Sequence, residues 1–220
     1  MKAQVLLVVV AACSAFAQGT FQNLDFEAAV IEQTQAPGFV SATNALPGWT
    51  VYRGTNQEAN VLYSAVGHGG TLVDLLGTNS TLTDGYHSLG GEFSVMLQGG
   101  VISGPGGILY AASASILQTG VVPASAKSVL FKAQHDTSGT LSVSLGGVSV
   151  PYFALSNGPD YTVFGGDVSS FAGQTMALEF VCRDCQTGIM AIGISTQSSS
   201  PPPPFLSQAS LPFPLLAPCF

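Results

Sequence analysis

Alternating hydrophobic and polar positions run through most of this chain. The clearest stretch lies between Gly139 and Gly147, where Leu141, Val143 and Leu145 alternate with serines. A period of two predicts a strand with one buried face and one solvated face. The same alternation marks residues 93–98 and 178–180. From their β-branched and aromatic content, further strands are predicted at residues 49–53, 60–65, 71–75, 112–118, 127–134 and 161–164.

Clusters of glycine, proline, asparagine and aspartate separate the predicted strands. Pro47-Gly48, Asp84-Gly85 and Gly146-Gly147 are typical of tight turns. No stretch of the sequence combines a sustained helical period with helix caps. Many short strands joined by turns predict an all-β fold, and residues 18–197 suit one antiparallel β-sandwich domain.

The first 17 residues have the pattern of a secretory signal peptide. Lys2 gives a positive start, an unbroken apolar run follows over residues 5–12, and Ala15 and Ala17 provide small residues before a cleavage site at Gln18. Cleavage before Cys13, as in bacterial lipoproteins, is the alternative, but it would leave an unusually short apolar run. Either reading predicts export.

The other end of the chain differs from the central part. Residues 198–220 carry no charge and are dense in proline, which removes a backbone donor and interrupts both sheets and helices. We therefore expect a disordered tail there. We also expect no transmembrane span in the mature chain, because the prolines break the apolar stretch.

Charge is scarce along the whole chain. Only 8% of residues are charged, and 5 Lys and Arg stand against 12 Asp and Glu, which gives a net charge of -7. A nucleic-acid partner is excluded, because phosphate neutralisation needs clusters of basic side chains. The 46% hydrophobic content argues against a charge-rich disordered chain, and 26 glycines with 13 prolines argue against a helical bundle.

Three short motifs together resemble a known family. They are N-L-D-F-E at residues 23–27, L-P-G-W at residues 46–49 and F-A-G-Q-T at residues 171–175. In their order and spacing, the chain resembles exported bacterial PEP-CTERM-type surface proteins with a galactose-binding-like domain, over residues 15–180. The resemblance implies a jelly-roll β-sandwich at or beyond the outer surface of bacteria that make exopolysaccharide.

The sorting signal of that family is altered here. The family has a Pro-Glu-Pro motif, an apolar helix and a basic end, whereas this chain has four prolines at residues 201–204, an apolar tail broken by proline and no basic end. The family's usual last strand, acidic and then apolar, is also missing after Val181. A frame shift near Val181 and a true divergent tail are the two explanations, and the sequence leaves both open.

Three residues of one predicted strand form the candidate ligand site. Trp49, the one tryptophan of the chain, would form with Tyr52 and Arg53 a platform for a sugar ring, because aromatic faces pair with the apolar faces of sugars. The alternative places Trp49 in the core, since it follows Pro-Gly at a strand start. Tyr52 would then face the opposite side.

The resemblance also implies a candidate metal site. In related carbohydrate-binding jelly rolls, a glutamate at the position of Glu27 helps to hold a structural Ca²⁺, together with an acidic partner from the last strand. Asp25 lies beside Glu27 in the sequence. Calcium takes about six to eight oxygen ligands, so the alternative is that Asp25 and Glu27 bind nearby backbone groups.

No catalytic motif emerges from the sequence. The three histidines lie in separate predicted loops without ligand spacing, and the carboxylates are scattered beside turn glycines rather than paired as in a glycosidase. Cys182 and Cys185 match C-x-x-C, but zinc would need two further ligands, and a local disulfide is the alternative in an oxidising compartment.

The sequence therefore favours a non-enzymatic β-sandwich protein that is secreted or carried on the outer cell surface or in the extracellular matrix. Its weakly charged faces, rich in serine, threonine and glycine, suit polar contacts with polysaccharide or an exopolysaccharide matrix. Two alternatives stay open: a secreted carbohydrate-active hydrolase with an unrecognised cleft, and a purely structural coat protein.

Overall fold

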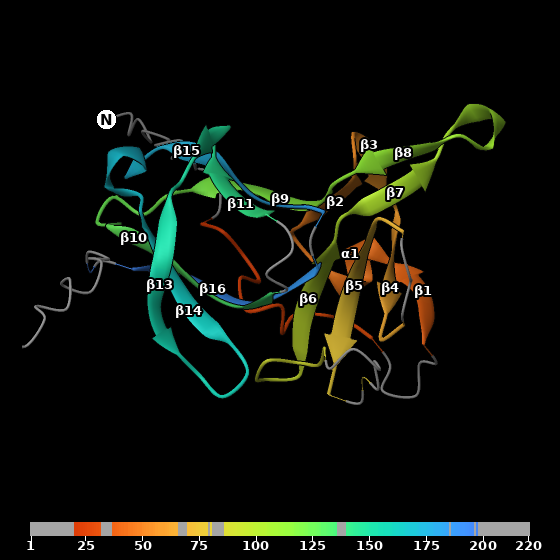
Figure 1. Ribbon diagram of the computed structural model, residues 1–220. Coiled ribbons are helices and arrows are strands. Elements are labelled where there is room, and N and C mark those ends of the chain that lie inside the picture. Colours follow the sequence, from red (N-terminus) through yellow and green to blue (C-terminus); the bar gives the residue numbers. More distant parts are fainter. Residues whose placement is uncertain are drawn as a thin grey trace, which may run out of the picture.

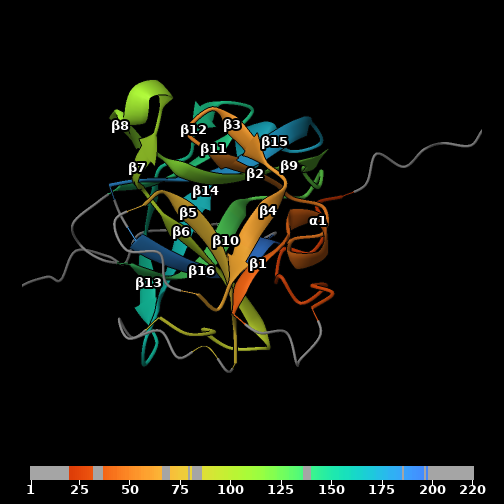
Figure 2. The same cartoon turned by 90° about the vertical axis from the view of Figure 1, so that its right-hand side faces the viewer.

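The computed structural model of the chain describes residues 20–31, 37–65, 70–78, 80, 86–135, 140–184, 186–195 and 197. Over these residues the chain is an all-β sandwich of one domain, in which two twisted sheets pack against each other (Figures 1 and 2). Among the named strands, all pairs are antiparallel except β4 with β5. The predicted all-β sandwich is confirmed, whereas the jelly-roll topology stays a prediction.

The larger sheet has eight strands. Its order is β1 (Gly38–Ser41), β4 (Asn60–Tyr63), β5 (Leu72–Gly77), β6 (Phe93–Gln98), β16 (Gln186–Ser195), β10 (Ser128–His135), β14 (Thr162–Asp167) and β13 (Tyr152–Asn157). Strand β16 lies in the middle of this order, where it pairs with β6 on one side and with β10 on the other.

The second sheet has six strands, and a separate hairpin has two. The order of the six is β12 (Val148–Ser149), β11 (Thr140–Leu145), β15 (Thr175–Arg183), β9 (Ala114–Val121), β2 (Thr50–Arg53) and β3 (Asn56–Glu58). The hairpin pairs β7 (Gly100–Ser103) with β8 (Leu109–Ala112). Three short helical turns are α1 (Ala42–Ala45), η1 (Pro105–Gly107) and η2 (Ser169–Phe171). No helix in the described part of the chain is long and apolar enough to span a membrane.

The core lies between the two sheets and follows the alternation read in the sequence. In β11, Leu141, Val143 and Leu145 are buried while the serines between them are half-buried. In β15, Leu178 and Phe180 are buried on either side of Glu179. The strands predicted at these two places are therefore confirmed, together with the assignment of their inward faces.

Aromatic side chains fill the centre of this core. The ring of Phe131 in β10 lies 5.3 Å from that of Phe180, 5.4 Å from that of Phe164 and 5.1 Å from that of Tyr152, measured between centroids. Edge-to-face and offset contacts at such distances add to the stabilisation that burial of these large side chains supplies. These rings join β10, β13 and β14 of the eight-stranded sheet to β15 of the six-stranded sheet.

Strand β6 differs from its predicted pattern. Alternation predicts one solvated face, but all six residues of β6 are buried. On the outer side of the sheet, Met96 packs with Leu72, Leu76 and Tyr86 in a second apolar cluster. Tyr86 comes from the segment before β6, so a loop that the periodicity does not reveal covers this part of the sheet.

Several strands are not among those predicted: β1, β3, β7, β8, β12, β13 and β16. The largest omission is β16, whose alternation is interrupted by Gly188 and Gly193. Ile192 of this strand is nevertheless buried in the core. In this chain, therefore, residues 186–195 are part of the eight-stranded sheet, and Cys182 and Arg183 end β15 of the six-stranded sheet.

The β7–β8 hairpin projects from the sandwich, as Figures 1 and 2 show. Its outer part carries apolar side chains in water: Ile108 is 56% exposed, Leu109 62% and Tyr110 48%. At its base the hairpin meets the turn between β2 and β3, because the backbone N–H of Gly54 donates to the carbonyl of Ser113 at 2.7 Å. Two clefts lie beside this junction.

Candidate functional site

The first cleft is built around Arg53, the last residue of β2. The guanidinium Nε of Arg53 donates to Oε1 of Glu58 at 2.8 Å. A short turn at Gly54 and Thr55 reverses the chain, so that β3 lies beside β2 and brings Glu58 back to the arginine. The side chain of Arg53 is 44% exposed and that of Glu58 23%, so the pair is fixed but reaches solvent.

Two adjoining depressions share this ion pair, and we call them together the Arg53 cleft. One, of about 450 Å³, is lined by Phe39, Asn60 and apolar residues of β4 and β5. The other, of about 390 Å³, is lined by Asn56, Thr71 and residues of β7. Arg53, Glu58 and Thr71 line both. Phe39 is 77% exposed, so an aromatic ring stands in water at the edge of this cleft.

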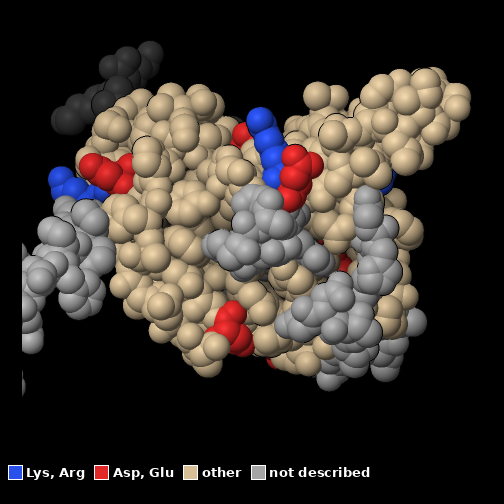
Figure 3. Space-filling model, in the orientation of Figure 1, with Lys and Arg blue, Asp and Glu red and all other residues tan. Residues whose placement is uncertain are grey.

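The second cleft lies on the other side of the junction, and we call it the Arg183 cleft. Its volume is about 480 Å³. The side chains with polar groups that line it are Thr55, Ser113, Ser115, Glu179, Arg183 and Asp184. Figure 3 shows that charged side chains are sparse on this face of the molecule, and that blue and red groups meet where the hairpin leaves the body.

Trp49 lies in the core. Its side chain is 6% exposed, its indole Nε1 donates to the carbonyl of Asn23 at 3.0 Å, and its ring lies 5.7 Å from that of Phe26. A buried indole has no face free for a sugar ring. The structure therefore agrees with the alternative in which Trp49 packs inside the sandwich.

Tyr52 and Arg53 are adjacent in β2 but do not meet at one site with Trp49. Tyr52 pairs with Ser115 of β9, and its half-buried side chain lies on the outer side of the six-stranded sheet, opposite to buried Val51. Of the three predicted ligand residues, Arg53 is the one that lines a cleft. Tyr52 as a ligand residue stays a prediction.

Asp25 and Glu27 bind backbone groups. Both carboxylate oxygens of Glu27 accept the N–H of Glu92 at 3.0 Å, and Oε1 also accepts the N–H of Phe93 at 3.2 Å. Oδ1 of Asp25 accepts the N–H of Glu27 at 3.3 Å. In the part of the chain that is described, no three His, Cys, Asp or Glu residues are grouped as a metal site would require. Glu27 thus fixes the start of β6, as in the alternative reading, and Asp25 and Glu27 as metal ligands stay a prediction.

Strand β5, which lines the Arg53 cleft, also contains the buried residue Asp74. Oδ2 of Asp74 accepts the N–H of Ala65 at 3.1 Å, while Oδ1 has no hydrogen-bond partner among the described residues. Burial raises the pKa of Asp74 from 3.8 to about 7, although the backbone N–H groups of Ala65 and Ser64 act in the opposite direction. This carboxyl group therefore titrates near neutral pH and is protonated below it.

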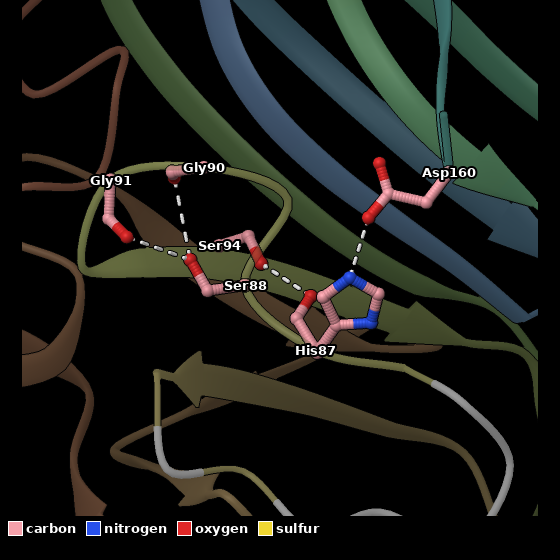
Figure 4. Close-up of polar contacts among 6 residues, drawn as sticks. All are labelled: His87, Ser88, Gly90, Gly91, Ser94 and Asp160. Carbon is pink, nitrogen blue, oxygen red and sulfur yellow. Dashed lines mark hydrogen bonds and ion pairs between the residues drawn. The ribbon is translucent and has the colours of Figure 1, made fainter. Parts of the chain in front are cut away.

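Away from both clefts, a histidine and an aspartate join two loops (Figure 4). Nε2 of His87 lies 2.6 Å from Oδ2 of Asp160. The hydroxyl of Ser94 donates to the backbone carbonyl of His87, and that of Ser88 lies 3.3 Å from the carbonyls of Gly90 and Gly91. Because the two hydroxyls are directed at backbone carbonyls, these contacts fasten the segment that covers β6 and do not make a serine nucleophile.

Cys182 is buried and disulfide-bonded. The other cysteines, Cys13, Cys185 and Cys219, lie outside the described residues, as do His68 and the predicted tail at 198–220. The disulfide at Cys182 lies at the end of β15, one residue before Arg183, so it is adjacent to the Arg183 cleft.

Sequence reasoning missed most of the residues that line the clefts. Glu58 lies five residues after Arg53, and that short spacing across a glycine turn is the signal that would have paired them. Phe39 and Arg183 carry no comparable local signal, because each reaches its cleft through the pairing of strands that are distant in the sequence.

Comparisons with known proteins give no family. No family model matches the chain, and no curated protein sequence matches it. Among solved structures, the enzymatically active domain of tailspike protein 4 from bacteriophage CBA120 is similar, with a TM-score of 0.36 and 16% sequence identity. The match covers 70% of this chain and 20% of that one. A likeness this remote carries no argument about function.

Proposed function

We propose that this protein is an exported, non-enzymatic component of the cell surface or extracellular matrix, and that it binds uncharged polysaccharide in the Arg53 cleft. The observation that carries the proposal is the combination, in one open cleft, of an exposed aromatic ring with a fixed ion pair. Phe39 supplies the ring, and Arg53 with Glu58 supplies the pair.

The aromatic ring gives the cleft an apolar contact for a sugar. Phe39 is 77% exposed, and Leu62, Leu72 and Val73 line the same depression. A sugar ring has an apolar face of C–H groups that packs against aromatic rings. Such packing would remove the Phe39 side chain from water. Such a surface is typical of sites that take amphipathic ligands.

The polar groups supply both donors and acceptors. The Arg53 guanidinium has donor N–H groups beyond the one that Glu58 accepts, Glu58 has a second carboxylate oxygen, and Asn60 has an amide. A hydroxyl group is both donor and acceptor, so neighbouring sugar hydroxyls match this set. The ion pair is neutral overall and the chain has a net charge of -7, so an uncharged polysaccharide is favoured over an acidic one.

Two features support the proposed location. Residues 1–17 have the pattern of a signal peptide. The disulfide at Cys182 is of a kind that persists in oxidising compartments outside the cytosol. The resemblance to exported surface proteins that accompany exopolysaccharide agrees with both.

A pull-down on defined polysaccharides tests the proposal. Purified protein is incubated with cellulose, cross-linked dextran, galactan and mannan, and with alginate as the acidic comparison. We expect retention on at least one uncharged polymer and none on alginate. Phe39→Ala should weaken retention about fivefold, since an aromatic contact contributes about 1 kcal/mol.

The matched control is Val30→Ala, because Val30 is 72% exposed but lines neither cleft. Its retention should equal that of the unmodified protein. The proposal is wrong if no uncharged polymer retains the protein, or if Phe39→Ala and Val30→Ala behave alike.

A second candidate function is glycoside hydrolysis, which one observation favours. Glu179 and Asp184 both line the Arg183 cleft, and hydrolysis of a glycosidic bond uses two carboxyl groups across a cleft. The same incubations can be assayed for new reducing ends. Release that is lost in Glu179→Gln would replace the non-enzymatic proposal with the hydrolase.

A further inference from the structure

The chain contains two arginines, Arg53 and Arg183, and each lines a cleft beside the base of the projecting hairpin. The guanidinium is a fork of N–H donors, which suits it to recognise pairs of oxygen atoms. The Arg53 cleft carries the proposed function. The polar groups of the Arg183 cleft are not explained by it.

The charged groups of the Arg183 cleft are available to a ligand. Arg183 is exposed at the end of β15, and its guanidinium makes no hydrogen bond or ion pair with a described residue. Glu179 lies four residues before Arg183 in β15, so the two side chains are on the same side of the strand. Asp184 is the next residue after Arg183 and lines the same cleft. One donor fork and two carboxylates therefore line one cleft of about 480 Å³ without neutralising each other by direct contact.

These groups fit a hydroxyl-rich, uncharged ligand. The guanidinium offers donors, the two carboxylates offer acceptors, and the hydroxyls of Thr55 and Ser113 offer both. Neighbouring hydroxyls of a sugar match an alternation of donors and acceptors. An acidic ligand is disfavoured, because two carboxylates outnumber the one guanidinium.

Different strands of the hairpin line the two clefts. The turn at Gly54 touches the hairpin base, where its N–H donates to Ser113 and a Cβ at Gly54 would lie 3.6 Å from that of Ala112. Residues of β7 line the Arg53 cleft, whereas Ala111 and Ala112 of β8 line the Arg183 cleft. The two clefts have no lining residue in common.

We propose that the Arg183 cleft is a second binding site for uncharged glycans, so that one molecule holds two polysaccharide strands and cross-links them. This inference rests on the proposed function of the Arg53 cleft. It adds that the protein organises a matrix and does not merely attach to it.

Binding at each cleft can be followed separately by NMR, because each has its own arginine and the chain has no other. The Nε–Hε resonances of Arg53 and Arg183 are recorded while cellotetraose, isomaltotetraose and β-1,4-galactotetraose are added in turn. We expect one tetrasaccharide to shift both resonances. In Arg183→Gln the Arg53 shift should persist, and in Arg53→Gln the Arg183 shift should persist.

The outcomes separate the two proposals. If a tetrasaccharide shifts Arg53 but none shifts Arg183, the second site is wrong while the proposed function stands. If no tetrasaccharide shifts either resonance, both proposals are overturned. If Arg183 shifts alone, neither holds in its present form.

Cross-linking is then measured by light scattering on mixing the protein with the soluble polymer of the tetrasaccharide that binds. The unmodified protein should raise the scattering. Arg183→Gln should lose that rise yet still bind the polymer through the Arg53 cleft. Lys127→Gln is the matched control, because it removes a positive charge that lines neither cleft and should scatter like the unmodified protein. Equal scattering by both variants would overturn cross-linking.

Discussion

The two arginine clefts show how differently one residue type is used within a single small protein. In the Arg53 cleft the guanidinium is held by Glu58 at 2.8 Å, beside apolar side chains and an exposed phenylalanine. In the Arg183 cleft the guanidinium has no such partner among the described residues, and hydroxyls and carboxylates line the same cleft. A paired arginine is oriented before a ligand arrives, whereas an unpaired one must be ordered by the ligand itself.

The clefts also rest on different parts of the sandwich. The Arg53 cleft is lined by β4 and β5, and β5 buries Asp74. The Arg183 cleft lies at the end of β15, where Gly99 packs against the backbone of Cys182 and Asp184. Changes beneath one cleft should therefore leave the other in place, whereas changes in the shared core should affect both.

The largest effect is expected from a substitution in the shared core, which should destabilise both clefts alike. Trp49→Ala should lower the free energy of unfolding by about 3 to 5 kcal/mol, because it leaves a cavity beside Phe26 and removes the hydrogen bond to Asn23. Urea unfolding followed by circular dichroism measures this, since the variant has no tryptophan fluorescence. A variant of unchanged stability that no longer binds glycan would instead make Trp49 a ligand residue.

The free energy of unfolding should depend on pH through Asp74, which lies in β5 beneath the Arg53 cleft. The pKa of Asp74 is about 7 in the folded chain against an ordinary value of 3.8, so the folded state binds its proton more tightly than the unfolded state. The stabilisation is complete below about pH 4 and is lost as the pH rises through 7, by roughly 4 kcal/mol in all. Asp74→Asn should lack this loss in urea unfolding between those values.

Asp167→Asn is the control for that measurement. The pKa of this exposed carboxyl is lowered, first by the backbone N–H of Ser169, so its titration lies below the pH window of Asp74. The variant should keep the full loss of stability between pH 4 and 7. If Asp74→Asn keeps it as well, the carboxyl of Asp74 is not the group responsible.

A change beneath the Arg183 cleft should be smaller and local. A Cβ at Gly99 would lie 2.6 Å from the backbone nitrogen of Asp184 and 2.8 Å from the carbonyl oxygen of Cys182, so Gly99→Ala forces backbone to move. We expect a loss of about 1 to 3 kcal/mol and a shifted Arg183 resonance with an unchanged Arg53 resonance. Gly70→Ala is the control for the stability measurement, because its nearest neighbour would be an ordinary contact at 4.0 Å.

The smallest effect concerns the ion pair itself. Glu58→Gln should change the free energy of unfolding by less than about 1 kcal/mol, because exposed ion pairs contribute little to stability. It should nevertheless release the Arg53 side chain, which would weaken polysaccharide retention while leaving binding at the Arg183 cleft unchanged. Glu179→Gln should show the reverse pattern. Identical binding defects in the two variants would mean that the clefts are not independent.

The sequence allowed the sandwich to be predicted where a strand has one buried and one solvated face. Strands β11 and β15 have this property, and their inward residues agree with the prediction. Strand β6 has no solvated face, because a loop covers its outer side. The residues of one strand contain no information on which distant segment covers that strand. Strand β16 was missed for a related reason. Its glycines interrupt the alternation of apolar residues, and its place in the sheet depends on pairing with β6 and β10, which are distant in the sequence.

The candidate site was predictable to the extent that it is local. Arg53 was correctly placed at the end of a strand, and it lines a cleft. Trp49 was ambiguous, because a tryptophan at a strand start fits both a core and a platform, and the neighbours that decide it come from residues 23–26. Asp74 had no distinguishing pattern, since its burial depends on chain segments on both sides of β5.

The position of β16 has a consequence for how this chain can fold during synthesis. Strands β6 and β10 emerge long before their common neighbour, so both must wait with unpaired edges until residues 186–195 leave the ribosome. Pairing between such distant segments is slow, and waiting edges are prone to aggregation. The eight-stranded sheet can therefore be completed only after the last of its described strands has been made.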